Sequence, residues 1–424
     1  MNRKNAFSGL LALSGALAFA GMASAAWDVG DPVVTYWGGP GYPGYREKLT
    51  ERAAKQLKEG GYNVAWASSV QELDVAAKYG LRCIFDLGLG TLCVTNEAAA
   101  AAAAKRIAAV KDHPALYIYH HDDEPPAGRF AELARTRLWL AEQDPNHAAW
   151  VNLLPTYANN TQLGVEGEII RAYWEHVRLF GEVYRPELLS YDHYQFNVGG
   201  DTGNYLLNLG VIRQSAAAQG IPFFNGVQSC TWTPGNLASP SSPRIPGPDE
   251  LRFLVWTTLA YGAQGIYYYV YAFQGHAGTI VGLDGKPGPN YEPLKVLNRE
   301  FVTVAKQTRG YRFVGAYLQG LHAPGTTPYG DQAVLKVAPK APSAELGRNQ
   351  ELTDTTLVSR FDDRNGPARF MVVNLDYRQD RKIAVKGPGP LERLDPATGA
   401  WISLKGDKAW ISLTRGGGVL LRVR

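Results

Sequence analysis

Residues 82–120 read RCIFDLGLGTLCVTNEAAAAAAAKRIAAVKDHPALYIYH, and this stretch indicates the fold. It begins with the short apolar run Arg82–Asp86 and ends with a second one, Leu116–His120, each typical of a buried strand. Between them, the alanine-rich segment Asn96–Lys111 has a high helix propensity and stops before Pro114. A strand, a helix and a strand in this order form a unit with two parallel strands. The stretch therefore predicts an α/β fold.

The same alternation continues on both sides of this stretch. It predicts eight strands and eight helices over residues 26–312, which suits a (β/α)8 barrel, also called a TIM barrel. An open doubly wound sheet is the alternative, but no glycine-rich turn follows the first expected strand. The expected strands are Val33–Tyr36, Asn63–Ala67, Arg82–Asp86, Leu116–His120, Ala149–Leu153, Leu188–Asp192, Pro222–Gln228 and Ile266–Tyr271. The expected helices are Tyr45–Lys58, Val70–Lys78, Asn96–Lys111, Ala127–Glu142, Glu166–Tyr184, Tyr205–Gln219, Pro248–Tyr261 and Tyr291–Lys306.

The pattern changes from about Phe313 onward. Helical periodicity gives way to short alternating stretches, and turn dipeptides such as Asn365-Gly366 and Thr398-Gly399 separate them. This predicts a small all-β sandwich domain over residues 313–424 with a structural role, while an accessory sugar-binding role stays open. The expected strands are Ala333–Val337, Thr356–Phe361, Ala368–Leu375, Lys382–Val385, Leu391–Leu394, Ala409–Leu413 and Val419–Val423.

The first 25 residues have the pattern of a signal peptide. Basic Arg3-Lys4 precedes an apolar run from Phe7 to Ala20, and Ala23-Ser24-Ala25 fits the rule of small residues at a cleavage site. We therefore expect cleavage near Ala25 and a secreted or periplasmic protein. No later apolar run is long and uniform enough to span a bilayer, so we expect no membrane insertion.

The composition excludes several classes of protein. With 45% hydrophobic residues and a net charge of +4, the chain is neither disordered nor strongly basic, so we expect no nucleic-acid partner. Cys83, Cys93 and Cys230 allow one disulfide at most and have no metal-binding or redox spacing, which favours buried thiols. The 23 Tyr and 10 Trp exceed what a core needs, and such flat amphipathic rings also suit sugar faces. The oligomeric state is left open.

Carboxylates at two expected strand ends are the candidate catalytic residues. In a (β/α)8 barrel the chemistry lies at the carboxyl ends of the strands. The fourth strand is followed by Asp122, Asp123 and Glu124, and like charges this close raise the pKa of at least one of them, as a general acid near neutral pH requires. The sixth strand ends at Asp192. If Asp192 is the partner of Glu124, we expect their carboxyls to lie about 5 to 10 Å apart in one pocket.

Amides and aromatic rings at the other strand ends predict a sugar pocket around these acids. Amides and tyrosines pair with hydroxyl groups, and aromatic rings stack on sugar faces. The loop 225–248 is long enough to shape one side of the pocket and is a candidate specificity loop. The expected substrate-binding residues are Tyr36, Trp37, Asp86, His121, Asn152, Tyr191, His193, Tyr194, Gln228, Trp232 and Tyr271.

Two motifs in the barrel resemble clan A of the glycoside hydrolases. Asp123-Glu124-Pro125 resembles the Asn-Glu-Pro signature of that clan, and Leu259–Ile266 resembles the region before strand eight of its β-galactosidase-like members. The resemblance implies a secreted glycoside hydrolase that cleaves a poly- or oligosaccharide, with Glu124 as the acid/base and Asp123 in the neighbouring substrate-binding place. Clan A carries its nucleophile as Glu on strand seven, where this chain offers only Gln228.

Several mechanisms and two rival functions remain open. An adjacent Asp-Glu pair also resembles barrel N-acetylhexosaminidases, in which Asp123 would orient the substrate's acetamido group and Glu124 would protonate the leaving oxygen. Asp192 could instead act as the nucleophile or base. Because the expected nucleophile is missing, a non-catalytic carbohydrate-binding barrel is the main rival. A metal-dependent hydrolase fits less well, because His120 and His121 are adjacent in a strand and point to opposite faces. We expect no metal and no cofactor.

Overall fold

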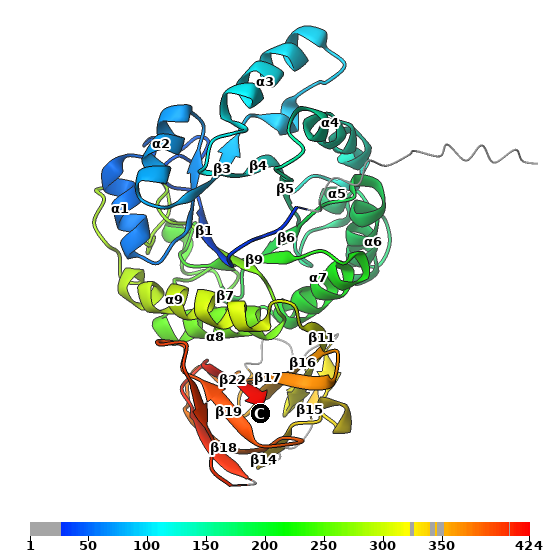
Figure 1. The fold of residues 1–424 in the computed structure, drawn as a ribbon, viewed down its shortest axis with the longest axis vertical. Coiled ribbons are helices and arrows are strands. Elements are labelled where there is room, and N and C mark those ends of the chain that lie inside the picture. Colours follow the sequence, from blue (N-terminus) through cyan, green and yellow to red (C-terminus); the bar gives the residue numbers. More distant parts are fainter. Residues whose placement is uncertain (1–26, 323–325, 340–343, 346–351, 407) are drawn as a thin grey trace, which may run out of the picture.

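The computed structural model describes residues 27–322, 326–339, 344–345, 352–406 and 408–424. The expected signal peptide, residues 1–25, lies outside them. Figure 1 shows a ring of helices around a barrel of strands, with a β-domain beside helices α8 (Pro248–Ala260) and α9 (Tyr291–Thr308). The molecule therefore has the two parts that the sequence predicts.

Eight parallel strands form the barrel. They make two four-stranded sheets, in the orders β2-β3-β4-β5 and β1-β10-β9-β6. Leu153 N–H donates to Ser190 O at 2.9 Å between β5 and β6, and Asn63 N–H donates to Val34 O at 3.1 Å between β2 and β1, so the barrel closes on both sides. The strands are β1 (Val33–Trp37), β2 (Val64–Ala67), β3 (Arg82–Asp86), β4 (Leu116–Asp123), β5 (Ala149–Asn152), β6 (Leu189–His193), β9 (Phe223–Gln228) and β10 (Gly265–Tyr269).

All eight expected strands and all eight expected helices are present, which confirms the (β/α)8 prediction. Three helices begin at least three residues later than predicted, at Glu51, Phe130 and Ile169, and a 3-10 turn at Ala127–Arg129 precedes the second of them. The first starts at Glu51 because the Thr50 side chain caps it by accepting from Ala53 N–H, and Glu168 caps α6 in the same way. The remaining helices are α1 (Glu51–Glu59), α2 (Val70–Lys78), α3 (Glu97–Val110), α4 (Phe130–Gln143), the additional short α5 (Asn160–Leu163), α6 (Ile169–Leu179) and α7 (Tyr205–Gln219).

Aromatic side chains fill the barrel interior. Trp37 packs against Trp66 and Trp150 with ring centroids 5.4 Å apart in each pair, and Trp150 lies 5.5 Å from Tyr267. These rings come from β1, β2, β5 and β10, so they join opposite sides of the barrel. Trp37 and Tyr267 also line the cavity described below. Part of the high aromatic content is therefore the packed floor of that cavity.

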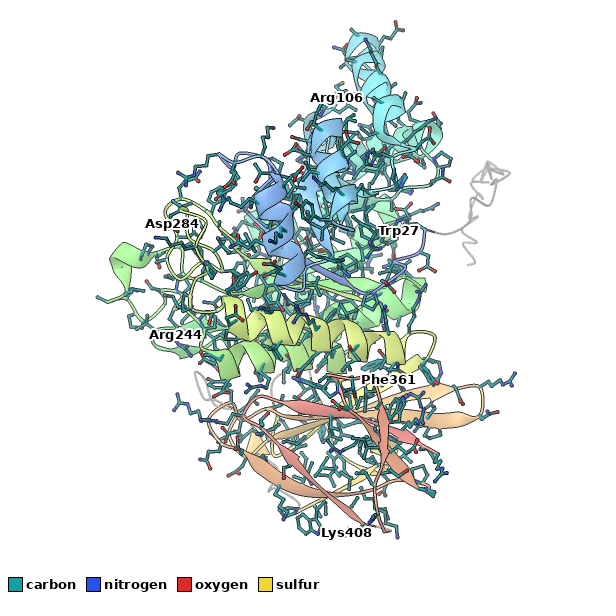
Figure 2. All side chains as sticks on the ribbon, turned by 60° about the vertical axis from the view of Figure 1, so that its left-hand side comes forward. Trp27, Arg106, Arg244, Asp284, Phe361 and Lys408 are labelled. Carbon is teal, nitrogen blue, oxygen red and sulfur yellow. The ribbon has the colours of Figure 1, made fainter. Side chains whose placement is uncertain are left out.

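The β-domain is a sandwich packed on the barrel. A seven-stranded sheet has the order β13-β11-β16-β17-β22-β19-β20, and a three-stranded sheet has the order β14-β18-β21. One face of the large sheet contributes Phe361 and Met371 to the same core as the barrel helices, and Figure 2 places Phe361 at this junction. The strands are β11 (Arg312–Gln319), β12 (Leu321–His322), β13 (Thr327–Pro328), β14 (Lys336–Ala338), β15 (Ala344–Glu345), β16 (Thr356–Asp363), β17 (Gly366–Asn374), β18 (Arg381–Lys386), β19 (Leu391–Leu394), β20 (Trp401–Ser403), β21 (Ala409–Leu413) and β22 (Gly418–Val423).

In the described residues, the β-domain contains five strands that were not expected, namely β11, β12, β13, β15 and β20. The expected strand Ala333–Val337 is a turn at Asp331–Ala333 followed by β14. β11 begins at Arg312, shortly after α9 ends at Thr308. Its apolar residues therefore resemble an extension of the helix in the sequence, and the strand was not predicted. The predicted turn at Asn365-Gly366 lies between β16 and β17.

The three cysteines differ in their exposure. Cys83, Cys93 and Cys230 are all free, and Cys93 is exposed, so the expectation of buried thiols is correct for Cys83 and Cys230 and wrong for Cys93. Cys93 is exposed because it lies in the loop between β3 and α3. None of the helices in the described ranges is long and apolar enough to cross a membrane.

Candidate active site

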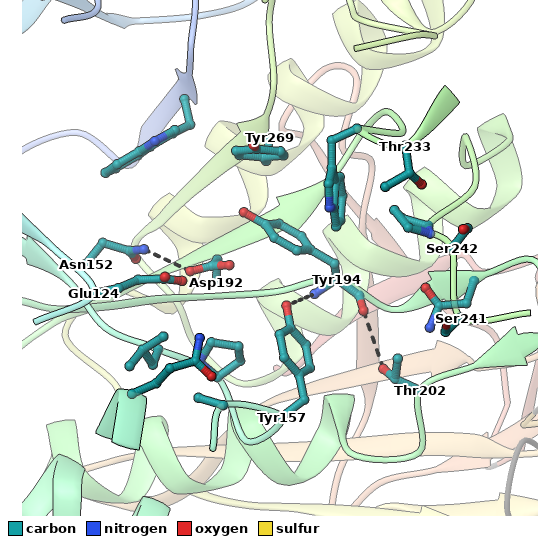
Figure 3. A pocket seen from close by; sticks show the side chains of 18 of the residues that line it. Glu124, Asn152, Tyr157, Asp192, Tyr194, Thr202, Thr233, Ser241, Ser242 and Tyr269 are labelled. Atoms are coloured by element: carbon teal, nitrogen blue, oxygen red, sulfur yellow. Dashed lines mark hydrogen bonds between the residues drawn. The ribbon is translucent and has the colours of Figure 1, made fainter. Parts of the chain in front are cut away.

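A cavity of about 760 Å³ opens at the carboxyl ends of the barrel strands. Figure 3 shows acidic, aromatic and hydroxyl side chains around it. It is lined by Trp37, Asp123, Glu124, Asn152, Leu154, Pro155, Tyr157, Ala158, Gln162, Asp192, Tyr194, Asn197, Thr202, Trp232, Thr233, Asn236, Ser241, Ser242, Pro243, Tyr267 and Tyr269.

Glu124 and Asp192 meet in this cavity. Glu124 directly follows β4, and its backbone has a φ of 51°, in the left-handed region that few non-glycine residues adopt. Its N–H donates to Asn152 O at 2.8 Å, which fixes the turn after the strand. Asp192 lies in β6 and is 2% exposed. Both carboxyl groups face this cavity, and a hydrogen-bond contact with Asp192 contributes to the raised pKa of Glu124.

The surroundings raise the pKa of both acids. Burial by the cavity walls raises the pKa of Glu124, and the charges of Asp192 and Asp123 raise it further. Burial also raises the pKa of Asp192, although the hydrogen bond from Asn152 acts in the opposite direction. Two ionised carboxylates cannot hydrogen bond to each other, so the contact requires a proton between them. The pair therefore holds one proton near neutral pH, as an acid paired with a base does.

Asn152, at the end of β5, connects the acids to each other. Its Nδ2 donates to Asp192 Oδ1 at 2.8 Å and to Asp123 Oδ1 at 3.2 Å. Its Oδ1 accepts from the Tyr267 hydroxyl at 2.5 Å and from the Ser190 hydroxyl at 3.4 Å. The carboxylates of β4 and β6 are therefore held by one amide, which β6 and β10 in turn orient.

The three successive carboxylates at the end of β4 do not all face the cavity. Asp123 lines the cavity, and burial raises the pKa of its carboxyl. Asp122 instead accepts from Arg129 Nη1 at 2.7 Å and does not line the cavity. A bulge in β4 between His120 and Asp122 shifts the register of its pairing with β5. This bulge re-aims the strand end, so Asp123 and Glu124 both face the cavity.

Aromatic rings and neutral polar groups form the remaining walls. Tyr194 lies 4.7 Å from Trp232 and 5.0 Å from Tyr269 between ring centroids, and its backbone N–H donates to the Tyr157 hydroxyl oxygen at 3.3 Å. Figure 3 shows Thr202, Thr233, Ser241 and Ser242 on one side of these rings. Thr233, Ser241 and Ser242 belong to the loop 225–248, which borders the cavity as expected. Such walls suit a ligand with many hydroxyl groups and apolar ring faces.

The structure brings together seven of the fourteen predicted site residues in this cavity. All three predicted catalytic residues line it, with four of the predicted substrate-binding residues. The seven are Trp37, Asp123, Glu124, Asn152, Asp192, Tyr194 and Trp232.

Four other predicted residues do not line the cavity. Tyr36, Tyr191 and His193 point away from it because side chains alternate along a strand, and Tyr271 lies beyond the end of β10. On β1, Tyr36 donates its hydroxyl to Pro40 O at 2.6 Å, and its ring packs on Tyr271. On β6, Tyr191 is fully buried, and His193 packs between the rings of Tyr157 and Tyr205. Their neighbours Trp37 and Asp192 occupy the inward positions. The substrate-binding role predicted for Tyr36, Tyr191, His193 and Tyr271 is therefore not supported by their positions.

Asp86, His121 and Gln228 are engaged elsewhere. Asp86 Oδ1 lies 3.3 Å from His120 Nδ1, and His121 Nδ1 lies 2.7 Å from the Tyr184 hydroxyl among the outer helices. Gln228, at the expected nucleophile position, accepts from Phe196 N–H at 2.8 Å and donates to Arg244 O at 2.7 Å. It ties together two loops and does not line the cavity. These three predicted side chains therefore do not line the cavity.

Most of the remaining lining residues were not predicted from the sequence. Tyr267 and Tyr269 lie two residues apart on β10, so both side chains point inward. This period-two spacing could have identified them from the sequence. Tyr157, Gln162, Asn197 and Thr202 come from connections after β5 and β6, for which the sequence carries no comparable signal.

No group of three or more His, Cys, Asp or Glu side chains in the described ranges could hold a metal ion. His120 and His121 point in opposite directions, the first toward Asp86 and the second toward Tyr184. The carboxylates in the cavity are instead partnered by one another and by the Asn152 amide.

The comparisons with known proteins concern the fold. No protein-family model and no curated protein matches the sequence. Among solved structures, a glycoside hydrolase has a TM-score of 0.53 at 15% sequence identity, covering 88% of this chain and 87% of its own. A glycoside hydrolase of family 5 from Bacteroides vulgatus has a TM-score of 0.53 at 13% identity, covering 88% of this chain and 84% of its own. The chain therefore shares its overall fold with these two solved structures.

Proposed function

We propose that this protein is a glycoside hydrolase in which Glu124 is the general acid. The proposal is supported by the fold, by a cavity with aromatic and hydroxyl-bearing walls at the catalytic end of the barrel, and by the acids in it. The observation that carries it is the contact of Glu124, which follows β4, with Asp192 of β6 in one cavity, beside Asn152, whose Nδ2 donates to Asp192 at 2.8 Å. This contact, with burial, keeps a proton on the pair near neutral pH, and a glycosidic oxygen needs such a proton to leave.

The test is hydrolysis of a panel of aryl glycosides and polysaccharides by the purified protein and by two variants. Glu124→Gln keeps the shape of the side chain and removes its proton, so turnover of a hydrolysed substrate should fall by about two to four orders of magnitude. Glu132→Gln is the matched control, because Glu132 is an exposed residue of α4 outside the cavity, and it should keep full activity. Binding of oligosaccharides without any hydrolysis would favour a carbohydrate-binding barrel instead.

The arrangement of the acids also supports a second candidate, hydrolysis with the help of the substrate's acetamido group. The cavity-lining carboxyls, Asp123, Glu124 and Asp192, gather around Asn152. A retaining nucleophile lies about 5 to 5.5 Å from the acid and an inverting base about 6.5 to 9.5 Å, so Asp192 would have to separate from Glu124 to take either role. In the acetamido route Asp123 orients that group and no such separation is needed.

The two routes make different demands on the substrate. The acetamido route confines activity to N-acetylated sugars and makes Asp123→Asn the severe variant. If Asp192 is the nucleophile or base, Asp192→Ala should be nearly inactive on any substrate, and azide should restore part of its turnover. Measuring both variants on one N-acetylated and one plain aryl glycoside decides between them.

We also propose that the protein acts outside the cytoplasm, after cleavage near Ala25. The support is the basic, apolar and small-residue pattern of the first 25 residues. Amino-terminal sequencing of the protein recovered from its natural source tests this proposal, and an N-terminus at or close to Ala26 is the expected result.

A further inference from the structure

The Asn152 amide has one orientation that satisfies all its neighbours. Its oxygen accepts from the Tyr267 hydroxyl at 2.5 Å and from the Ser190 hydroxyl at 3.4 Å. An amide carries its acceptor on one side and its two donors on the other, so the NH2 group must face Asp192 and Asp123. The reverse orientation would direct the amide oxygen at two carboxylates. Tyr267 and Ser190 therefore determine what the acids receive from Asn152.

This orientation treats the two acids of the pair differently. Asp192 accepts a hydrogen bond from Asn152 at 2.8 Å, and a donated N–H stabilises the ionised form of a carboxyl group. Glu124, in contrast, has its side-chain hydrogen bond with the Asp192 carboxyl. The one proton that the contact requires is therefore more stable on Glu124 than on Asp192.

We propose that Asn152 and Tyr267 are positioning residues that keep the shared proton of the Glu124–Asp192 pair on Glu124. The proposal rests on the function proposed above, in which Glu124 must be protonated to act. It adds that a tyrosine hydroxyl on β10, acting through one amide on β5, selects which carboxyl of the pair is the acid.

Among the groups around Glu124 and Asp192, the Asn152 amide is the main reason why the proton is more stable on Glu124 than on Asp192. Burial raises the pKa of each surrounding tyrosine, so these tyrosines stay neutral over the working range, and the Tyr194 hydroxyl also hydrogen bonds to Asp192. The histidine that acts electrostatically on Asp123 is His120, which is paired with Asp86. The titratable groups that face Asp192 are Asp123, Glu124, Tyr157, Tyr173, Tyr194, Tyr267 and Tyr269.

Tyr267→Phe is the test, and the neighbouring residue supplies a matched control. Tyr268 is also buried on β10, and its hydroxyl donates to Asn298 Oδ1 at 2.8 Å, outside the cavity. Both substitutions remove a buried tyrosine-to-asparagine hydrogen bond, but only Tyr267→Phe frees the amide that holds the acids.

The first measurement is the pH profile on an aryl glycoside that the unmodified protein hydrolyses. Without the oriented amide, ionised Asp192 loses the hydrogen bond from Asn152 and keeps the one from Tyr194, so its pKa rises. The acidic limb of kcat should therefore move up by about one pH unit and kcat should fall by about tenfold, with KM nearly unchanged. Tyr268→Phe should leave both limbs where they are. An acidic limb that does not move in an active Tyr267→Phe variant would overturn the proposal.

The second measurement needs no substrate, so it separates this proposal from the proposed function. The Asn152 donor stabilises ionised Asp192 more than protonated Asp192. The loss of thermal stability in Tyr267→Phe should therefore be larger at pH 8 than at pH 5, whereas the loss in Tyr268→Phe should be the same at both. Equal losses at the two pH values for Tyr267→Phe would contradict the positioning role. If no glycoside is hydrolysed, the proposed function fails while this comparison still stands.

Discussion

Glu124 combines an unusual backbone conformation with an unusual environment. Its φ of 51° is sparsely populated for a residue with a side chain, and such strain persists where the surrounding structure imposes it. Here Pro125 follows Glu124 in the sequence. The backbone N–H of Glu124 donates to Asn152 O and holds Glu124 at the strand end. The carboxyl is thereby aimed at Asp192 inside an aromatic cavity. Both features are consistent with a residue selected for chemistry rather than for stability.

The acid pair should make folding stability depend on pH. Glu124 and Asp192 have pKa values that are raised in the folded protein, so the folded state holds more protons than the unfolded state above the ordinary carboxyl range. The pair's contribution is therefore favourable at low pH and is lost as the pH rises through the folded pKa values. Glu124→Gln removes one of these groups. Its unfolding temperature, relative to that of the unmodified protein, should rise between pH 5 and pH 8, and a constant difference would contradict the raised pKa.

The elements of the barrel depend on a few close approaches between strands. Gly226 on β9 faces Tyr267 on β10, and a Cβ at position 226 would lie 2.2 Å from the Tyr267 ring. Two strands can therefore hold the Tyr267 hydroxyl against Asn152 only because residue 226 has no side chain. The same strand also carries Gln228, which ties two loops to the barrel rim.

Gly226→Ala should accordingly displace Tyr267. We expect a loss of about 1 to 3 kcal/mol in the free energy of unfolding, because the ring must leave its packed position, together with a fall in activity of the kind predicted for Tyr267→Phe. Gly235→Ala in the following loop is the control, because no atom lies within 4 Å of its added Cβ. Chemical denaturation of both variants measures the effect, and equal stabilities would show that Tyr267 does not need this space.

The sequence predicts the barrel elements because each carries its own local signal. Thr50, Ser69 and Asn96 cap their helices, and the barrel strands are short apolar runs between such helices. The site is harder to predict. The choice between Tyr191 and Asp192, or between Tyr36 and Trp37, depends on which face of the strand turns inward. The contact between Glu124 and Asp192 joins residues 68 positions apart, so no short stretch of the sequence predicts it.

At the scale of the whole molecule, the sandwich packs on the barrel and contacts one rim of the cavity. Phe361 and Met371 of the sandwich share a core with the barrel helices, so the two parts are packed together. Tyr377, in the loop after β17, donates its hydroxyl to both carboxylate oxygens of Asp201, at 3.0 and 2.9 Å. Asp201 belongs to the hairpin of β7 (Phe196–Asn197) and β8 (Gly200–Asp201), beside the cavity residues Asn197 and Thr202. The sandwich therefore supports one rim of the cavity.

Loosening this contact should affect binding more than chemistry. Tyr377→Phe keeps the ring packed against Phe196 and removes the hydroxyl that holds Asp201. We expect KM to rise by about two- to tenfold with kcat nearly unchanged, because the acids of β4 and β6 stay in place. Steady-state kinetics on a hydrolysed oligosaccharide checks this. A fall in kcat at constant KM would mean that the hairpin acts on the chemical step.

Activity should not depend on a metal ion. The cavity carboxylates are partnered by Asn152 and by each other, and no metal-binding group is found in the described ranges. Exhaustive chelation followed by dialysis should therefore leave kcat/KM unchanged. Loss of activity that one added divalent ion restores would favour a metal-dependent hydrolase.

The central claim is that Glu124 protonates the leaving oxygen, and the dependence of its variant on the leaving group tests it most directly. An acid matters most when the leaving group is poor, so kcat/KM of Glu124→Gln should fall by about 100- to 10,000-fold on an alkyl glycoside. On the dinitrophenyl glycoside of the same sugar, whose leaving group needs no proton, the loss should be about tenfold or less. Equal losses on the two substrates would contradict the assignment of Glu124 as the general acid.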